Sequence, residues 1–125
     1  MIYGTGCDIV EIPRIEHALS RFGERFMNKI LSAREQTEVH GRLAEYLAAR
    51  FAAKEAAVKA LGTGFRQGIQ MPQIEITNNA LGAPSLTFLD EAGRYASEHG
   101  ITRAFVSLSH ERHSAVAFVV LECAG

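Results

Sequence analysis

The feature that most constrains this fold is a long helical pattern over residues 43 to 61, part of the stretch ARFAAKEAAVKALGTG at 49–64. Its apolar stripe at helical spacing consists of Leu47, Phe51, Val58 and Leu61. Lys54 completes this face, and Gly62 and Gly64 end the helix. An ammonium group on a core-facing stripe must reach water, meet a carboxylate, or bind an anion from outside. The chain therefore builds around one central helix whose inner face carries a charge that needs a partner.

Shorter patterns on both sides of this helix indicate strands and further helices. Strands are predicted at 2–11, 73–77 and 85–89, and in RAFVSLSHE and HSAVAFVVLE around a turn near Arg112. Helices are predicted at 13–22, ended by Gly23, from Ser32 with Glu35 in capping-box spacing, and from a capping Asp90 to about His99. This order favours an α+β fold with a mainly antiparallel sheet packed against one long and several shorter helices.

Length and composition predict one domain over residues 1–125. The net charge of −1 gives no general attraction to nucleic acid. No apolar run is long enough to span a membrane, and the start MIYGTGCDIVEI lacks the features of a signal peptide. Cys7 and Cys123 are therefore expected to be reduced thiols in the cytoplasm.

The segment from Ile12 to Arg34 is locally basic, although the whole chain is nearly neutral. Arg14, Arg21 and Arg25 recur at spacings of seven and four, so they share one face if the helix continues through Gly23. The apolar side chains beside them are Phe22 and Phe26. This face is either an ordinary solvated surface or a docking surface for an acidic helix of a partner.

Asp8 is unusual because aspartate is depleted in strands. Alternation along the strand places it on the same face as Ile2 and Val10. It is either a solvated carboxylate at a strand end or a ligand held on a rigid element for a hard cation such as Mg²⁺.

The cations of the central helix also have two interpretations. Arg50 and Lys54 fall on the apolar stripe, where they could bind phosphate and leave Glu55 free to ligate a metal. Alternatively, the Lys–Glu sequence is a local ion pair, or Lys54 reaches water past Phe51.

The loops NNALGAP and SLSHERH give weaker signals. Asn79, Gly82 and Pro84 form a turn for conformational reasons alone, or they let a nucleotide approach the backbone. His110 is a surface histidine or a phosphate contact, and pairing it with His113 for zinc lacks further ligands at metal spacing. A hydrolase built on Ser109 and His110 lacks the glycines of a nucleophile elbow.

Taken in order, GCDIVEIPRI, ARFAAKEAAVKALGTG, NNALGAP and SLSHE resemble the holo-acyl-carrier-protein synthases, the short, single-domain 4′-phosphopantetheinyl transferases. The resemblance covers essentially the whole chain. It implies transfer of phosphopantetheine from coenzyme A to a serine of an acyl carrier protein, with release of adenosine 3′,5′-bisphosphate. It further implies Mg²⁺, a homotrimer with active sites between subunits, a role in fatty-acid biosynthesis, and the corresponding fold. Polyketide carriers remain open as substrates.

The resemblance also assigns roles to individual residues. Asp8 and Glu55 match the metal ligands and, with Lys59 near the diphosphate, the catalytic group. The positions that match the coenzyme A site are Arg50, Lys54, Gly62, Asn79, Gly82, Pro84 and His110. The positions that match the carrier-docking surface are Arg14, Arg21, Phe22, Arg25 and Phe26.

Two alternatives of other classes remain at this stage. A non-catalytic module that binds coenzyme A or a nucleotide would explain Arg50, Lys54 and Lys59, but it gives no reason for Asp8 and Glu55. A structural oligomerisation domain explains neither the carboxylates nor the lysine on the inner face.

Overall fold

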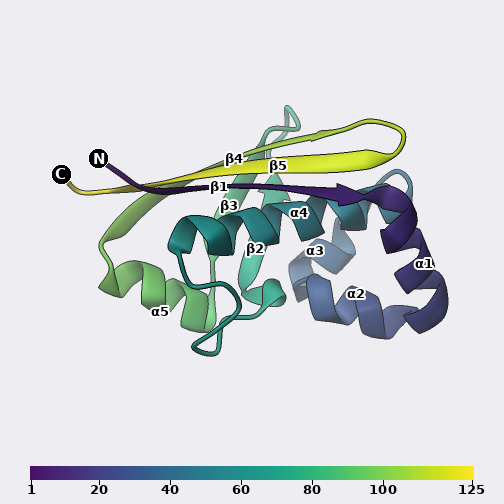
Figure 1. Cartoon of the computed structure of the whole chain (residues 1–125), viewed down its shortest axis with the longest axis horizontal. Coiled ribbons are helices and arrows are strands. Elements are labelled where there is room, and N and C mark those ends of the chain that lie inside the picture. Colours follow the sequence, from purple (N-terminus) through teal and green to yellow (C-terminus); the bar gives the residue numbers. More distant parts are fainter.

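The computed structural model describes all 125 residues and contains two antiparallel sheets and five α-helices (Figure 1). The strands are β1 (Ile2–Glu11), β2 (Ile74–Asn78), β3 (Pro84–Phe88), β4 (Ile101–His110) and β5 (Ser114–Cys123). The helices are α1 (Ile12–Phe22), α2 (Glu24–Ile30), α3 (Ala33–Thr37), α4 (Leu43–Leu61) and α5 (Asp90–Glu98), with a short 3₁₀ turn η1 (Met71–Gln73) before β2. The predicted α+β class, all five strands and the central helix are confirmed.

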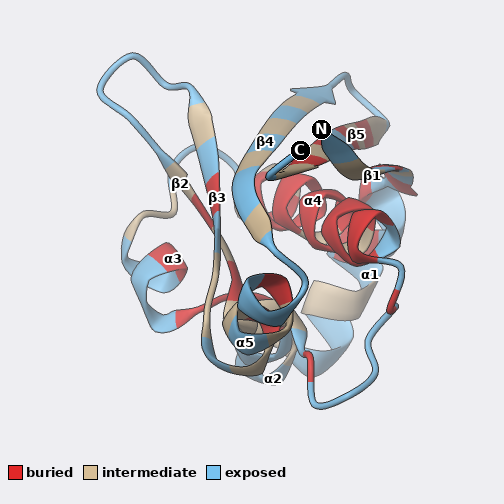
Figure 2. Ribbon diagram, turned by 90° about the vertical axis from the view of Figure 1, so that its left-hand side faces the viewer, coloured by how far each residue is buried: buried red, intermediate tan, exposed pale blue.

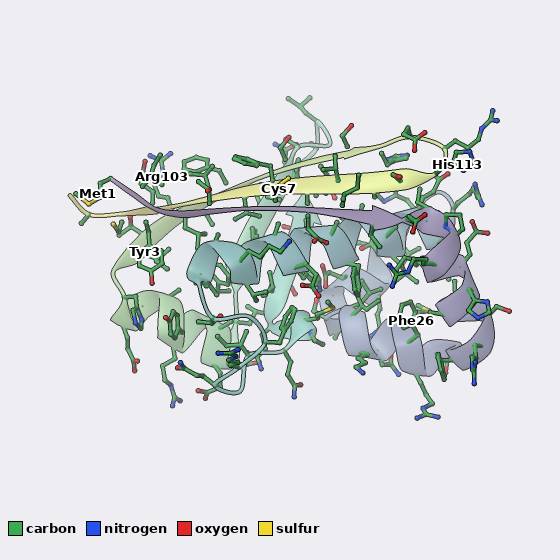
Figure 3. All side chains as sticks on the ribbon, in the orientation of Figure 1. Met1, Tyr3, Cys7, Phe26, Arg103 and His113 are labelled. Atoms are coloured by element: carbon green, nitrogen blue, oxygen red, sulfur yellow. The ribbon has the colours of Figure 1, made fainter.

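The larger sheet has the order β1-β5-β4, with both pairs antiparallel, and α4 lies along one of its faces (Figure 1). Alternation along β5 directs Ala115, Ala117, Val119 and Leu121 toward the interior, where all four are buried. Helix α4 is buried along most of its length, as the red ribbon in Figure 2 shows. The opposite face of the sheet carries no helix (Figures 1 and 3).

Two glycines on β1 bring this strand against the backbone of α4. A Cβ atom on Gly6 would overlap the carbonyl oxygen of Ala56, and one on Gly4 would overlap that of Ala60. Because any side chain here would push the strand and helix apart, the glycines and alanines fix their close approach. This approach places the next inward-facing residue of β1, Asp8, beside the C-terminal half of α4.

The basic N-terminal segment is two helices and not one. Gly23 adopts φ 57° and its N–H bonds to the Leu19 carbonyl, which ends α1 before α2 begins at Glu24. This positive φ breaks the helical path, so Arg25 does not continue the face that Arg14 and Arg21 form on α1. Gly23 is the predicted stop of α1, so the condition under which all three arginines would share one face is not met.

Two predicted helix caps have different outcomes. The capping box of α3 is confirmed: Ser32 Oγ accepts a bond from Glu35 N, and the Glu35 carboxylate accepts one from Ser32 N. Asp90 is not the cap of α5, because Leu89 occupies that position and no side chain caps the helix. Asp90 is instead the first residue of the helix, with φ +50°, so the cap lies one position before the predicted one.

The two chain ends lie side by side (Figure 1), where the N-terminal ammonium donates to the Cys123 carbonyl at 2.8 Å. Cys7 and Cys123 are both free thiols, as predicted. In the three-stranded sheet, Cys7 stands opposite Phe118 and lies on the face away from α4 (Figure 3). None of the helices is both long and apolar enough to cross a membrane.

Candidate active site

Asp8, Glu55 and Lys59 gather where β1 crosses α4. Lys59 Nζ donates to Asp8 Oδ1 at 3.0 Å and to the Cys7 carbonyl at 3.0 Å. Glu55 lies one helical turn before Lys59 on α4, so both side chains project from the same side of the helix. The structure thus brings together the three residues that the sequence predicted as the catalytic group.

The charges in this cluster influence one another. Burial raises the pKa of Glu55, the nearby Asp8 carboxylate raises it further, and Lys59 lowers it. The hydrogen bond to Asp8 and the charge of that carboxylate raise the pKa of Lys59. Two carboxylates whose mutual repulsion is offset by a single ammonium form a site of local negative potential.

This pair of carboxylates fits a divalent cation of the magnesium type. Mg²⁺ is commonly held by one or two carboxylates together with substrate phosphates and water. Asp8 and Glu55 supply the two carboxylates. No cluster of three or more His, Cys, Asp or Glu side chains at metal-binding distances is present in the chain. A cation at this site would thus take its remaining ligands from water and substrate.

Arg50 lies earlier on α4 and is held on two sides. Its guanidinium carbon stands 4.1 Å from the ring centroid of Tyr46, and its NH2 group donates to Asn78 Oδ1 at 2.6 Å. The side chain is 5% exposed, and its Nε–H has no hydrogen-bond partner. Stacking and the bond to Asn78 fix the plane of the guanidinium, which suits bidentate binding of a phosphate.

The hairpin of β2 and β3 contacts Arg50 through Asn78, the last residue of β2. Asn78 Nδ2 donates to the Gly82 carbonyl at 2.8 Å, so the same residue contacts both Arg50 and the turn. The Asn79 carboxamide oxygen accepts the N–H groups of Leu81 and Ala83, which orders the loop before Pro84. The predicted residues Asn79, Gly82 and Pro84 thus form one rigid tip that is linked to Arg50.

Two further predicted coenzyme A positions, His110 and Gly62, lie at opposite ends of α4. His110 Nε2 lies 3.7 Å from Glu45 Oε2 near the start of the helix, and more than half of its side chain is exposed. Gly62 ends the helix in the left-handed conformation, with φ 84°. Neither contacts the Asp8 cluster directly, and their coenzyme A contacts stay predictions.

The prediction that Lys54 binds a coenzyme A phosphate is wrong. Lys54 is fully buried and donates to Glu35 Oε1 at 2.6 Å, the Ile30 carbonyl at 2.6 Å and the Met71 carbonyl at 3.1 Å. Burial lowers the pKa of Lys54 and the Glu35 carboxylate raises it. All three N–H groups of the ammonium are already used inside the protein, so none is left for an external anion. The charge on the central stripe meets a carboxylate of its own chain.

Three of the five predicted docking residues line an open groove between the N-terminal helices, α4 and residues 65–72. Phe22 and Phe26 line it together with Phe51 from α4, and its volume is about 830 Å³. Arg25 from α2 also lines the groove, and Figure 3 labels Phe26 on the side of α2 toward α4. Arg14 and Arg21 are exposed on α1, with the Arg21 guanidinium carbon 5.5 Å from the Phe22 ring centroid. The structure thus combines a hollow apolar surface with several arginines.

Sequence reasoning missed three residues around the cationic helix. Glu35 was predicted only as a helix cap, although its carboxylate also neutralises Lys54. Asn78 and Tyr46, which hold Arg50, were not singled out. Asn78 begins the loop NNALGAP, so the sequence pattern could have drawn attention to it. Nothing in the sequence indicates that residues 35 and 54 form a pair.

Comparison with known proteins agrees with this arrangement. The family described as the 4′-phosphopantetheinyl transferase superfamily matches residues 4–119 of the chain. The chain is 51% identical over 122 residues to a holo-[acyl-carrier-protein] synthase of Desulfovibrio desulfuricans, covering 98% of each sequence. It is 49% identical over 123 residues to that of Cronobacter sakazakii, covering 97% of this chain and 98% of the relative.

Solved structures give the same result in three dimensions. The holo-[acyl-carrier-protein] synthase of Neisseria meningitidis superposes with a TM-score of 0.92 at 42% identity, covering 98% of this chain and 99% of that one. The Helicobacter pylori synthase, solved in complex with coenzyme A, superposes with a TM-score of 0.85 at 31% identity, covering 94% of this chain and 99% of that one.

The fold is that of a phosphopantetheine-transferring enzyme, and the chain belongs to the 4′-phosphopantetheinyl transferase superfamily. The resemblance seen in the sequence, to the short holo-acyl-carrier-protein synthases, is confirmed.

Proposed function

We propose that this chain, acting as one domain over residues 1–125, transfers the 4′-phosphopantetheine group from coenzyme A to a serine of an apo acyl carrier protein. Adenosine 3′,5′-bisphosphate is the other product. The observation that carries this proposal is the cluster of Asp8, Glu55 and Lys59 at the crossing of β1 and α4, in a chain about half identical to synthases of this kind. The Helicobacter pylori relative binds coenzyme A, which supports the donor substrate.

In this proposal Asp8 and Glu55 hold Mg²⁺. When bound, the cation would offset charge on the diphosphate and orient it for transfer. The proton that the carrier serine loses goes to a metal-associated water or to one of the carboxylates that ligate the cation. Lys59, with an exposed ammonium beside Asp8, offsets the charge that develops on the departing phosphate.

The donor substrate extends from this cluster along α4 in our proposal. Arg50 binds a phosphate of the nucleotide, because its guanidinium is held in a fixed plane by Tyr46 and Asn78. The rigid tip at Asn79, Gly82 and Pro84 contacts the adenosine portion, and the remaining contacts come from His110 and Gly62.

The acceptor docks on the N-terminal helices in our proposal. Arg14 and Arg21 on α1 attract the acidic surface of the carrier, while Phe22 and Phe26 receive an apolar side chain in the groove. Arg25 contributes from α2, at an angle to the α1 pair. The break at Gly23 therefore changes the geometry of the docking surface but retains its charge.

We also propose that the chain forms a homotrimer through the face of the larger sheet that no helix covers. Ile9, Phe105 and Phe118 are 68%, 44% and 47% exposed on this face. Apolar side chains that remain exposed on an uncovered sheet favour association with another copy of the chain.

The two free thiols suit a reducing compartment, so we place the reaction in the cytoplasm, in support of fatty-acid biosynthesis.

The decisive experiment is intact mass spectrometry of an apo acyl carrier protein after incubation with this enzyme, coenzyme A and Mg²⁺. We expect the carrier to gain one phosphopantetheine, and EDTA to prevent the gain. A carrier that is modified by another transferase but not by this chain would contradict the proposal. Calorimetry with coenzyme A would then identify a binding module, if the chain binds it equally well with and without Mg²⁺.

A further inference from the structure

The ion pair between Lys54 and Glu35 joins parts of the chain that belong to two different surfaces. Lys54 Nζ bonds to the carbonyl of Ile30, at the end of α2, and to that of Met71, in η1. Both residues line the groove that also contains Phe22 and Phe26. The positions of two groove-lining segments are therefore set by one ammonium group.

Glu35, the acidic partner of the pair, is connected to the residues that hold Arg50. Glu35 Oε2 accepts the N–H of Ile76 on β2 at 3.0 Å, and Asn78, which binds Arg50, lies two residues further along the same strand. The backbone carbonyl of Glu35 accepts the hydroxyl of Tyr46 at 2.8 Å, and the Tyr46 ring stacks on Arg50. Both groups that orient the Arg50 guanidinium are thus connected to Glu35.

A purely structural explanation does not account well for such a pair. Replacing a buried ion pair by apolar residues of similar volume is often neutral or stabilising, so the pair adds little to stability by itself. Its hydrogen bonds are directional, however, and both partners are 0% exposed, so their geometry is well defined.

We propose that Lys54 and Glu35 are positioning residues that hold the docking groove and the Arg50 site in the shapes that bind the carrier and the donor. The inference rests on the proposed function, because it needs both a carrier groove and a donor site. Neither residue touches a substrate; each acts through Ile30 and Met71 on one side and through Tyr46 and Asn78 on the other.

The test is the double variant Glu35→Leu with Lys54→Met, which removes both charges and keeps the volume. We expect the protein to remain folded, with KM for the carrier and KM for coenzyme A each raised about 3- to 30-fold, the range of energetic coupling through such networks. We expect kcat to stay within about 3-fold of the wild type, because Asp8, Glu55 and Lys59 form no hydrogen bond to the pair.

Val119→Ala is the matched control for lost stability. Val119 is 0% exposed on the sheet side of α4 and takes no part in this hydrogen-bond network. A variant that is only less stable has a smaller folded fraction, which lowers the apparent kcat and leaves both KM values unchanged. That pattern in the double variant, or kinetics equal to wild type, would overturn the proposal.

Tyr46→Phe keeps the proposal testable if the double variant does not fold. It removes only the hydroxyl that bonds to Glu35 and retains the ring under Arg50. We expect KM for coenzyme A to rise about 3-fold, with KM for the carrier unchanged; an unchanged KM for coenzyme A would overturn the proposal. If the wild-type protein itself transfers nothing, the proposed function fails before any variant is compared.

Discussion

Lys59 on α4 donates to Asp8 on β1 at 3.0 Å, although 51 positions separate the two residues in the sequence. The contact exists because Gly4 and Gly6 let the strand lie directly against the alanines of the helix. A strand that carried side chains at these positions would lie further from α4, and its carboxylate would no longer reach the ammonium. The close approach of two backbones therefore determines the geometry of the candidate active site.

This close approach predicts that Gly6→Ala damages both stability and activity. The new methyl group would overlap the Ala56 carbonyl, so the variant should lose about 3 kcal/mol in free energy of unfolding and transfer more slowly. Urea denaturation and the mass-spectrometric transfer assay measure the two effects. Thr5→Ala, on the exposed face of the same strand, should cost about 1 kcal/mol or less. Equal stability of the Gly6 variant and the wild type would contradict this account of the packing.

The carboxylate pair predicts that Asp8→Asn lowers Mg²⁺-dependent transfer by about 100-fold or more, while the fold survives. Asparagine keeps the shape of the side chain but removes the charge that a cation and Lys59 require. The measurements are kcat in the transfer assay and circular dichroism. Glu11→Gln removes an exposed charge from the same strand and should change neither. A folded Asp8 variant with wild-type activity would remove Asp8 from the site.

The docking surface predicts that Arg14→Glu combined with Arg21→Glu raises KM for the carrier by about 10-fold or more and leaves KM for coenzyme A unchanged. Reversed charges on α1 would repel an acidic carrier, and the effect should shrink at high salt because screening weakens it. Steady-state kinetics at two salt concentrations measure this. Arg94→Glu, exposed on α5, is the control and should leave the carrier KM unchanged. An unchanged carrier KM in the double variant would show that the carrier docks elsewhere.

Tyr46 predicts a pH dependence of stability in the alkaline range. Burial raises its pKa above the ordinary value of 10.0, and its hydroxyl donates to the Glu35 carbonyl. In the window between the unfolded and folded pKa values the native state binds more protons, so this contribution is present below pH 10.0 and is lost as the pH rises through the folded pKa.

Comparison of the wild type with Tyr46→Phe isolates this contribution. We expect the wild type to be more stable by about 1 kcal/mol near neutral pH, and this advantage to decrease as the pH rises through that window. Urea denaturation midpoints of both proteins across the alkaline range measure it. An advantage that stays constant through this range would show that the hydroxyl does not titrate as the structure indicates.

The uncovered sheet face predicts that Phe118→Glu weakens self-association. Phe118 lies on the middle strand of the sheet and is 47% exposed, so a carboxylate there would be desolvated in any interface that uses this face. We expect association to be about 30-fold weaker or more, as for a central interface residue, with lower transfer if active sites lie between subunits. Sedimentation velocity measures the oligomeric state, and Ser97→Glu on α5 controls for added charge. A Phe118 variant that associates like the wild type would exclude this face as the interface.

The sequence by itself determined the elements and the identity of the chemical groups. Alternating and 3.6-residue patterns gave the strands and α4, because these periods follow from local backbone geometry. The motifs around Asp8, Glu55 and Lys59 indicated the family and the catalytic group, which the fold brings together at one crossing.

The tertiary structure alone decided the partner of each buried charge. The sequence allowed the Lys54 ammonium to reach water, to meet a carboxylate, or to bind an external anion. Only the packing of α3 against β2 and α4 shows that Glu35 neutralises it. The positive φ of Gly23 likewise separated Arg25 from Arg14 and Arg21. The physical reason is that a local pattern fixes which face of an element is apolar, whereas the pairing of a buried charge depends on a residue 19 positions away that only the completed fold brings within hydrogen-bond distance.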